Sequence, residues 1–308
     1  MNQFHRTVTI QIAEGTTNTG TALQVQNLRV SFHIKKTSTS ECNTASIQIY
    51  NLNKDDREHI NGLPLNNLVI VKAGYIAKDQ EIIFVGNTLL SSINIERPNV
   101  ITKIEAQDGK FAMNQLKFSI TYQAGTFAVK ILKDILNKSK SGLDVNHVDW
   151  SQITDRQYKN GFCFQGEAKV LLTNVCNYLE AEWSIQNNQM KIFPSGKNNT
   201  AQIIYLTPET GLIGSPEKLL DDSLALHGTL RKKETTKEVG VTGKKYRKTI
   251  GGGYKFKSLL QPFVEPGSVI QVKCDAISDL KFRVVEVEHI GDTHGNDWYS
   301  IINGMIMQ

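Results

Sequence analysis

The chain has 308 residues, of which 40% are hydrophobic and 21% are charged, and its formal net charge at pH 7 is +5. This composition is ordinary for a globular protein and leaves enough apolar material for about two domains with cores of their own. No apolar run approaches the ~18 residues that a membrane-spanning helix needs. No signal-peptide pattern follows the polar start, so we expect a protein made and folded in a cytoplasm.

The first clear pattern predicts an antiparallel pair of strands. Residues 28–35 alternate strictly between apolar and polar side chains, and residues 45–49 do so again after a polar loop. Such period-two alternation is typical of strands with one buried face and one hydrated face.

A short helix over residues 54–60 is predicted directly after this pair. Asn53 is a good N-cap, and the two aspartates of the first turn lie where the helix dipole favours negative charge. Strand patterns then return, with Arg97-Pro98-Asn99 at the tip of a hairpin. The strands expected here cover residues 68–73, 81–85, 89–95 and 100–106. Several short strands at this spacing indicate a sandwich or barrel, and we assign residues 1–109 to a first β-domain.

The pattern changes after residue 109, and residues 110–200 are predicted to form a small α+β module. Thr126 is a candidate N-cap for a helix, and residues 167–180 have the cleanest helical period in the chain. A hairpin is expected over residues 182–193, because Asn187-Asn188 tolerates the positive φ of a tight turn. The residues that share the apolar face of the first helix are Phe127, Ile131, Leu132, Ile135 and Leu136.

Residues 201–308 are β-rich again and are assigned to a second β-domain. Strands are expected over residues 203–206, 268–272, 282–289 and 298–303. Between residues 231 and 257, ten lysines and arginines stand against two glutamates, so this segment carries +8 and the rest of the chain sums to −3. The order of elements predicts an α+β fold, mainly β, in which two β-domains flank a small α+β module.

Five short motifs resemble the baseplate hub proteins of contractile-tailed bacteriophages, the late control protein D-like tail hubs. The resemblance follows the same order and spacing over most of the chain. The motifs are residues 27–32 with 43–52, residues 210–216, residues 257–262, residues 265–268 and residues 291–299.

This resemblance implies two tube-forming β-domains of like fold, barrel- or sandwich-like, on either side of the inserted module. Three chains would form a homotrimeric ring of six quasi-equivalent domains that joins the sixfold tail tube to the threefold spike and encloses the DNA channel. The implied partners are other copies of the chain, the tail tube protein, the spike protein, the baseplate wedge proteins, and genomic DNA passing without sequence specificity. The implied location is the tail baseplate of the virion, after assembly in the host bacterial cytoplasm.

Polar residues on the predicted strands are candidates for contact with the channel or with a neighbouring subunit: Arg29, His33, Lys35 and Gln48. In the basic segment, the candidate residues for contact with a polyanion or a subunit are Lys244, Lys245, Arg247 and Lys248. The three glycines at 251–253 lack the spacing of a phosphate-binding loop, so a flexible loop or hairpin tip is expected there.

Asp292, His294 and Asp297 form a compact cluster beside Trp298. These residue types could hold a metal ion or form an acid–base pair. Glycine and asparagine surround them, and aspartates in turns usually bond to nearby backbone groups. We therefore expect a tight hairpin with structural hydrogen bonds.

The four cysteines form no metal-binding spacing, and we expect reduced thiols, with Cys163 and Cys176 as small buried residues. No motif of a nucleophilic or metal-dependent enzyme occurs, so we expect no catalytic activity, no metal and no cofactor. Digestion of the cell wall would then have to come from a partner. Two alternatives remain: the hub of a tailocin or related contractile injection system, and a tail protein that hydrolyses peptidoglycan or binds carbohydrate.

Overall fold

The computed structural model describes residues 5–15, 22–39, 41–75, 80–109, 116–138, 144, 148–195, 203–219 and 253–307. Strands dominate these ranges, as the sequence predicts, and none of the described helices is long and apolar enough to cross a membrane. The helices are α1 (Lys54–Gly62), α3 (Ala128–Lys138) and α4 (Ala168–Tyr178), with short 3-10 turns at Trp150–Gln152 and Pro208–Thr210.

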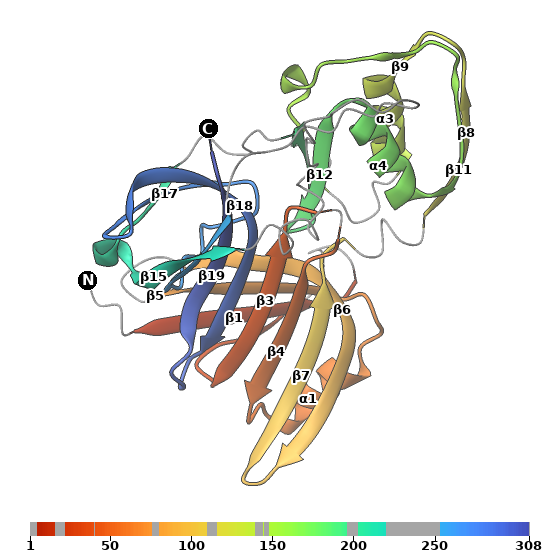
Figure 1. Cartoon of the computed structure of the whole chain (residues 1–308). Coiled ribbons are helices and arrows are strands. Elements are labelled where there is room, and N and C mark those ends of the chain that lie inside the picture. The colour runs from red at the N-terminus through yellow and green to blue at the C-terminus, as the bar shows by residue number, and fades with distance from the viewer. Residues whose placement is uncertain are drawn as a thin grey trace.

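The N-terminal strands form the first half of a large sheet (Figure 1). Their order in the sheet is β3-β4-β7-β6-β5-β1-β2, and every neighbouring pair is antiparallel. They are β1 (Arg6–Ala13), β2 (Ala22–Val25), β3 (Val30–Thr37), β4 (Thr44–Tyr50), β5 (Leu68–Tyr75), β6 (Glu81–Glu96) and β7 (Asn99–Gln107). Apolar residues from β1 and β5 share one core with those of β3, β4 and β7, so the sheet folds over on itself. Ile60 of α1 closes this core.

The C-terminal strands continue the same sheet around a second core. Their order is β15-β16-β19-β18, and β17 pairs with β18 on one side and β14 on the other. They are β14 (Ile203–Leu206), β15 (Leu212–Leu219), β16 (Gly253–Leu259), β17 (Val269–Cys274), β18 (Ile277–Asp292) and β19 (Trp298–Ile306). The run β15-β16-β19-β18-β17 therefore has the same order as β3-β4-β7-β6-β5.

One strand pair joins the two halves. β18 lies antiparallel to β3, with a register that runs from Glu286 opposite Thr37 to Asp292 opposite Ser31. Backbone bonds extend this ladder at both ends, from Ser38 N–H to Val285 O and from Thr293 N–H to Val30 O. The predicted divisions at residues 109 and 200 remain a prediction, and strands from the two outer segments share one hydrogen-bonded sheet.

Residues 116–195 build a separate core of two helices and three small sheets, which lies beyond one end of the large sheet (Figure 1). The sheets pair β8 (Lys117–Tyr122) with β11 (Phe162–Glu167), β9 (Thr126–Phe127) with β10 (Gln157–Tyr158), and β12 (Ala181–Gln186) with β13 (Gln189–Pro194). Asn187 and Asn188 both have positive φ at the tip of the β12–β13 hairpin, as predicted.

The predicted cap of α1 is confirmed, whereas the cap of α3 was wrong. Asn53 accepts a hydrogen bond from the Asp56 N–H at 2.7 Å. Thr126 instead lies in β9 and donates to the Gln123 carbonyl, while Asp155, distant in sequence, accepts from the Val129 N–H at the start of α3. Phe127 consequently lies outside the helix and is 48% exposed.

Two further predictions fail. The strands expected at residues 81–85 and 89–95 are one strand, β6, because its residues 81–87 pair with β5 and its residues 87–96 pair with β7 without a break. Cys163 is exposed because it lies on the outward side of β11, whose burial alternates. Cys176 is buried as expected, and none of the four cysteines, all of which lie in the described part of the chain, is in a disulfide.

Candidate functional site

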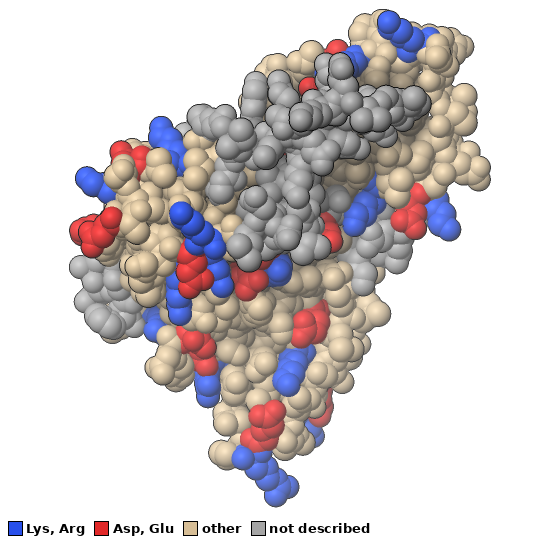
Figure 2. All heavy atoms as spheres, in the orientation of Figure 1, with Lys and Arg blue, Asp and Glu red and all other residues tan. Residues whose placement is uncertain are grey.

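The outer face of the large sheet is the candidate functional site, and we call it the polar face. It spans the eight strands from β15 to β6, and the registers align its side chains across neighbouring strands. In Figure 2 acidic and basic side chains are interspersed over this side of the molecule. Residues that the register brings together on this face include Lys257, Tyr299, Glu288, Lys35, His33, Ser46, Gln48, Lys103 and Glu105.

Opposite charges pair across the strands of this face. Lys35 Nζ lies 3.1 Å from Glu286 and 3.5 Å from Glu288, and His33 Nε2 lies 3.2 Å from Glu288. Partial burial disfavours the charge on Lys35, but the hydrogen bond to Glu286 and the attraction of both glutamates outweigh it and raise its pKa. Ser46 donates to Glu105 at 2.8 Å. The face therefore holds many charges without a region of one sign around these pairs.

The four polar residues predicted to contact the channel or a neighbouring subunit all lie at this face. His33 and Lys35 alternate on β3, and Gln48 lies opposite Ser31 on the neighbouring strand. Arg29 precedes β3, stacks over the Tyr50 ring at 4.3 Å and pairs with Asp292 at 2.8 Å. All four are thus partly or fully accessible side chains on one continuous surface.

The Asp292 cluster is a tight hairpin between β18 and β19, as predicted. Asp292 Oδ1 accepts from the N–H groups of His294 and Gly295, each at 2.9 Å. Burial acts to raise the pKa of Asp292, but Arg29 and these N–H groups outweigh it and lower the pKa. Arg6 from β1 donates to the carbonyls of Asp292 and Gly295, which ties the turn to the other layer of the sheet.

The basic candidates Lys244, Lys245, Arg247 and Lys248 lie outside the described residues, as do Gly251 and Gly252. Two other lysines of the same segment, Lys255 and Lys257, are described and lie on β16. The Lys257 ammonium stands 4.0 Å from the centre of the Tyr299 ring on the polar face.

A second polar cluster, which sequence reasoning missed, lies where the β12–β13 hairpin meets the large sheet. We call it the socket. Asn43 donates to the Ile185 carbonyl at 2.8 Å, to Gln186 Oε1 at 3.1 Å and to Asp108 at 3.2 Å. Gln186 in turn donates to the Thr37 carbonyl at 2.8 Å. These groups are buried, so each hydrogen bond replaces one that water would otherwise supply.

Glu265 is the charged centre of the socket. Its carboxylate accepts from Asn187 at 2.7 Å and Lys191 at 2.8 Å in the hairpin, and from Lys36 of β3 at 3.3 Å. Burial acts to raise the pKa of Glu265, but the two ammonium groups outweigh it and lower the pKa to about 2. One side chain from the loop before β17 therefore holds three parts of the chain together.

Two buried titratable groups flank the socket. Burial raises the pKa of Asp108 to about 6, although it accepts bonds from Asn188 and Asn43 that favour its charged form. Burial lowers the pKa of His289 to about 3, and its Nδ1 lies 2.9 Å from Ser300 Oγ. Neither side chain faces an open cavity, and both belong to the packing of the sheet.

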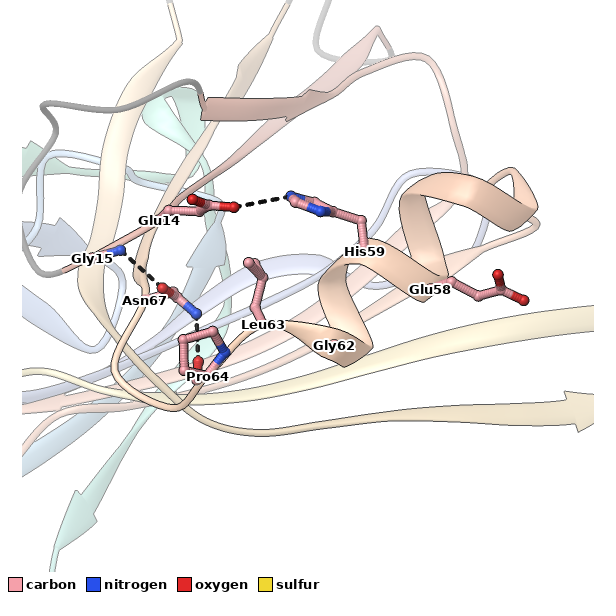
Figure 3. A pocket seen from close by; sticks show the side chains of 8 residues that line it. All are labelled: Glu14, Gly15, Glu58, His59, Gly62, Leu63, Pro64 and Asn67. Atoms are coloured by element: carbon pink, nitrogen blue, oxygen red, sulfur yellow. Dashed lines mark hydrogen bonds and ion pairs between the residues drawn. The ribbon is translucent and has the colours of Figure 1, made fainter.

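A shallow hollow of about 520 Å³ lies beside α1 (Figure 3). Its polar groups are paired with one another: Glu14 lies 3.9 Å from His59, and Asn67 accepts from the Gly15 N–H and donates to the Pro64 carbonyl. Glu58 points away from the hollow. Across the described residues, no group of three histidine, cysteine, aspartate or glutamate side chains is placed to hold a metal ion.

Several solved structures share this fold over nearly the whole chain. A tail protein from Neisseria meningitidis MC58 has a TM-score of 0.66 at 9% identity, covering 98% of this chain and 96% of that chain. The 43 kDa tail protein of prophage MuSo2 from Shewanella oneidensis has a TM-score of 0.62 at 10% identity, covering 97% of each chain. The E. coli c3393 protein, a type VI secretion system component with structural similarity to T4 bacteriophage tail proteins gp27 and gp5, has a TM-score of 0.61 at 10% identity, with 91% and 74% covered.

No curated protein sequence matches the chain. At identities near 10% the structural likeness shows the fold, and the family comes from the sequence itself. A family model described as baseplate hub gp41 matches residues 7–219, which is more than half of the chain. The predicted resemblance is confirmed, and the chain belongs to the baseplate hub gp41 family of structural bacteriophage tail proteins.

Proposed function

We propose that three copies of this chain close a ring at the centre of the baseplate, where they join the sixfold tail tube to the threefold spike and enclose the DNA channel. The repeated strand order carries this proposal. Since one chain contains the run β3-β4-β7-β6-β5 and the run β15-β16-β19-β18-β17, three chains supply six similar units. Such a ring fits a sixfold partner on one side and a threefold partner on the other. The chain would assemble in the host cytoplasm and act in the virion tail.

The polar face would line the channel. Its paired charges, such as Lys35 between two glutamates, keep the surface hydrated without a strong field of one sign. A channel lining of this kind has no extended basic region that would bind a polyanion, so DNA can pass without being held. Arg29, His33 and Gln48 would face the same channel: His33 lies on the same side of β3 as Lys35, Gln48 lies opposite Ser31, and Arg29 pairs with Asp292 of the same face.

The module over residues 110–200 would lie outside the ring, between the β-domains over 1–109 and 201–308, and would meet the wedge proteins. The socket supports a fixed position for it, because Glu265 and Asn43 bind the β12–β13 hairpin directly. The function is mechanical and needs no catalytic group or cofactor.

Light scattering and particle imaging of the purified chain test this proposal. We expect a ring-shaped trimer, formed alone or with the tail tube protein. A strict monomer, even with the tail tube protein present, would contradict it. Turbidity loss of a peptidoglycan suspension on adding the chain would favour a wall-hydrolysing tail protein instead. The hub of a tailocin or related injection system would give the same ring, and a neighbouring capsid gene separates a phage from a tailocin.

The basic segment is proposed as a contact for polyanions or for an acidic subunit surface, through Lys244, Lys245, Arg247 and Lys248. Its concentration of charge in the sequence supports this, since phosphate contacts by lysine and arginine need no base-specific motif. Replacing all four by alanine should weaken binding to duplex DNA of any sequence and reduce its salt dependence. Unchanged binding by the quadruple variant would leave no role for the segment in contact with DNA.

A further inference from the structure

The two halves of the sheet match strand by strand, and the match extends to an irregularity. β6 and β18 each have 16 residues. Each pairs through its first part with the strand before it, and each shifts register against the following strand in its middle, at Thr88/Leu90 in β6 and at Val284/Glu286 in β18. β6 is therefore the counterpart of β18, and β15 is the counterpart of β3.

One difference between the counterparts is whether their edges are paired with another strand. The second part of β18 has β19 on one side and β3 on the other. Within the described part of the chain, residues 90–96 of β6 pair with β7 alone, and β15 pairs with β16 alone. Among the described residues, the polar face thus ends on each side in an edge that no strand pairs with, and α1 reaches the β6 edge at Ser91, whose hydroxyl donates to the Ile60 carbonyl. These two edges are the counterparts of the two that meet inside the chain.

The open edges also carry exposed apolar side chains. Leu90 is 58% exposed and Ile95 is 70% exposed on β6, and Ile213 is 39% exposed on β15. An unprotected strand edge is a template for pairing with another chain, and proteins that remain single usually blunt it with lysines or cover it. No lysine stands in residues 90–96, and β15 holds one, Lys218.

We propose that residues 90–96 of one copy pair antiparallel with β15 of the next copy, which repeats between chains the β18–β3 ladder found within one chain. This inference rests on the proposed function and names the surface through which its subunits join. The contact is head-to-tail, because the two edges differ and neither needs to meet its own copy.

The internal ladder sets the register between copies. On the polar face it pairs Lys35 with Glu288, His33 with Ile290 and Ser31 with Asp292. Transferred to the counterpart strands, the pairs between copies are Ser92 with Leu219, Asn94 with Glu217 and Glu96 with Ile213. The irregular stretch between Ile213 and Glu217 holds Pro216, which has no N–H to offer a ladder and is tolerated at an edge.

Disulfide formation between two variants, each with one added cysteine, tests this joint, the contact between β6 of one copy and β15 of the next. We would make Asn94→Cys and Glu217→Cys separately in a Cys163→Ser background, assemble a mixture of the two, and oxidise it. We expect a disulfide-linked dimer on non-reducing electrophoresis from the mixture and not from either variant alone. Gln48→Cys mixed with Lys257→Cys is the matched control, because both positions lie inside the polar face and away from its edges.

The outcomes separate this inference from the proposed function. If imaging shows rings but the mixture gives no linked dimer, the proposed joint is wrong and the hub function stands. If Asn94→Cys forms the dimer alone, identical edges meet, which overturns the head-to-tail contact. If the unmodified chain remains monomeric with the tail tube protein, both the function and the joint fail.

Discussion

Lys35 and Lys36 are neighbours on β3, yet they belong to different parts of the molecule. The side chain of Lys35 is 45% exposed on the polar face, whereas that of Lys36 is 1% exposed and reaches Glu265 in the socket. Both form ion pairs with glutamate. Because strand residues point alternately to opposite faces, one step along the chain separates a half-exposed ammonium from a fully buried one. Removing the two lysines should therefore have different consequences for stability.

The largest difference is expected between alanine variants of these two lysines. Lys36→Ala removes a buried ammonium and leaves Glu265, which is 22% exposed, with Lys191 as its ammonium partner, so the loss should be about 3 kcal/mol, the lower end of the range for a broken buried pair. Lys35→Ala should cost less, about 1–2 kcal/mol, because the ammonium that it removes is 45% exposed, although the partner Glu286 is only 6% exposed. Urea unfolding of both variants measures this difference. Equal losses would show that burial does not distinguish the two pairs.

The next largest effect is expected on the pH dependence of the unfolding free energy, through Glu265. Its pKa of about 2 lies below the ordinary value of 4.5, so its contribution is present above pH 4.5 and is lost as the pH falls toward 2. Glu265→Gln should lower the unfolding free energy at pH 7 by on the order of 3 kcal/mol and flatten its fall below pH 4.5. If the unfolding free energy of Glu265→Gln, measured by heat or urea, fell below pH 4.5 as steeply as that of the unmodified chain, this role would be ruled out.

Asp108 is the internal control, since its pKa moves the other way. A carboxyl whose pKa rises from 3.8 to about 6 on folding favours the folded state below pH 3.8, and this contribution is lost as the pH rises through about 6. Asp108→Asn should therefore change how the unfolding free energy varies between pH 4 and 6. It should leave the loss of stability that protonation of Glu265 causes below pH 4.5 unchanged.

A smaller effect is expected from Asn43→Ala, which removes the hydrogen bonds of an uncharged side chain from the socket, one of them to the Asp108 carboxyl. The Thr37 N–H and the Ile185 carbonyl would lose their partner while buried, at a total cost on the order of 2 kcal/mol. Hydrogen exchange should also rise in the β12–β13 hairpin more than in β3. Gln24→Ala, which removes the exposed pair with Gln11, is the matched control and should change little.

The sequence predicted correctly those structural features that depend on residues close together in the chain. The alternation over residues 28–35, the Asn53 cap and the Asn187-Asn188 turn all depend on local sequence, and the structure has all three. Lys36 looked like the start of a polar loop, because no local signal shows that a partner 229 residues away stabilises its charge.

The same limit applies to the socket and to the helix cap at Asp155. The partners of Asn43 in the β12–β13 hairpin lie more than 140 residues away in sequence, at separations of 142 and 143. The polar face could be foreseen strand by strand, but its continuity across β18 and β3 depends on a pairing that periodicity does not encode.

The β18–β3 ladder also determines when the fold can be completed. Arg29 and Asp292, which pair beside this ladder, are 263 residues apart. During synthesis the free edge of β3 has to wait for nearly the entire chain before its partner emerges from the ribosome. Contacts of such long sequence separation form slowly, and an unpaired edge is prone to pair wrongly in the meantime. We therefore expect the strand pair that unites the sheet to form late in folding, and until then the unpaired edge of β3 exposes newly made chains to aggregation.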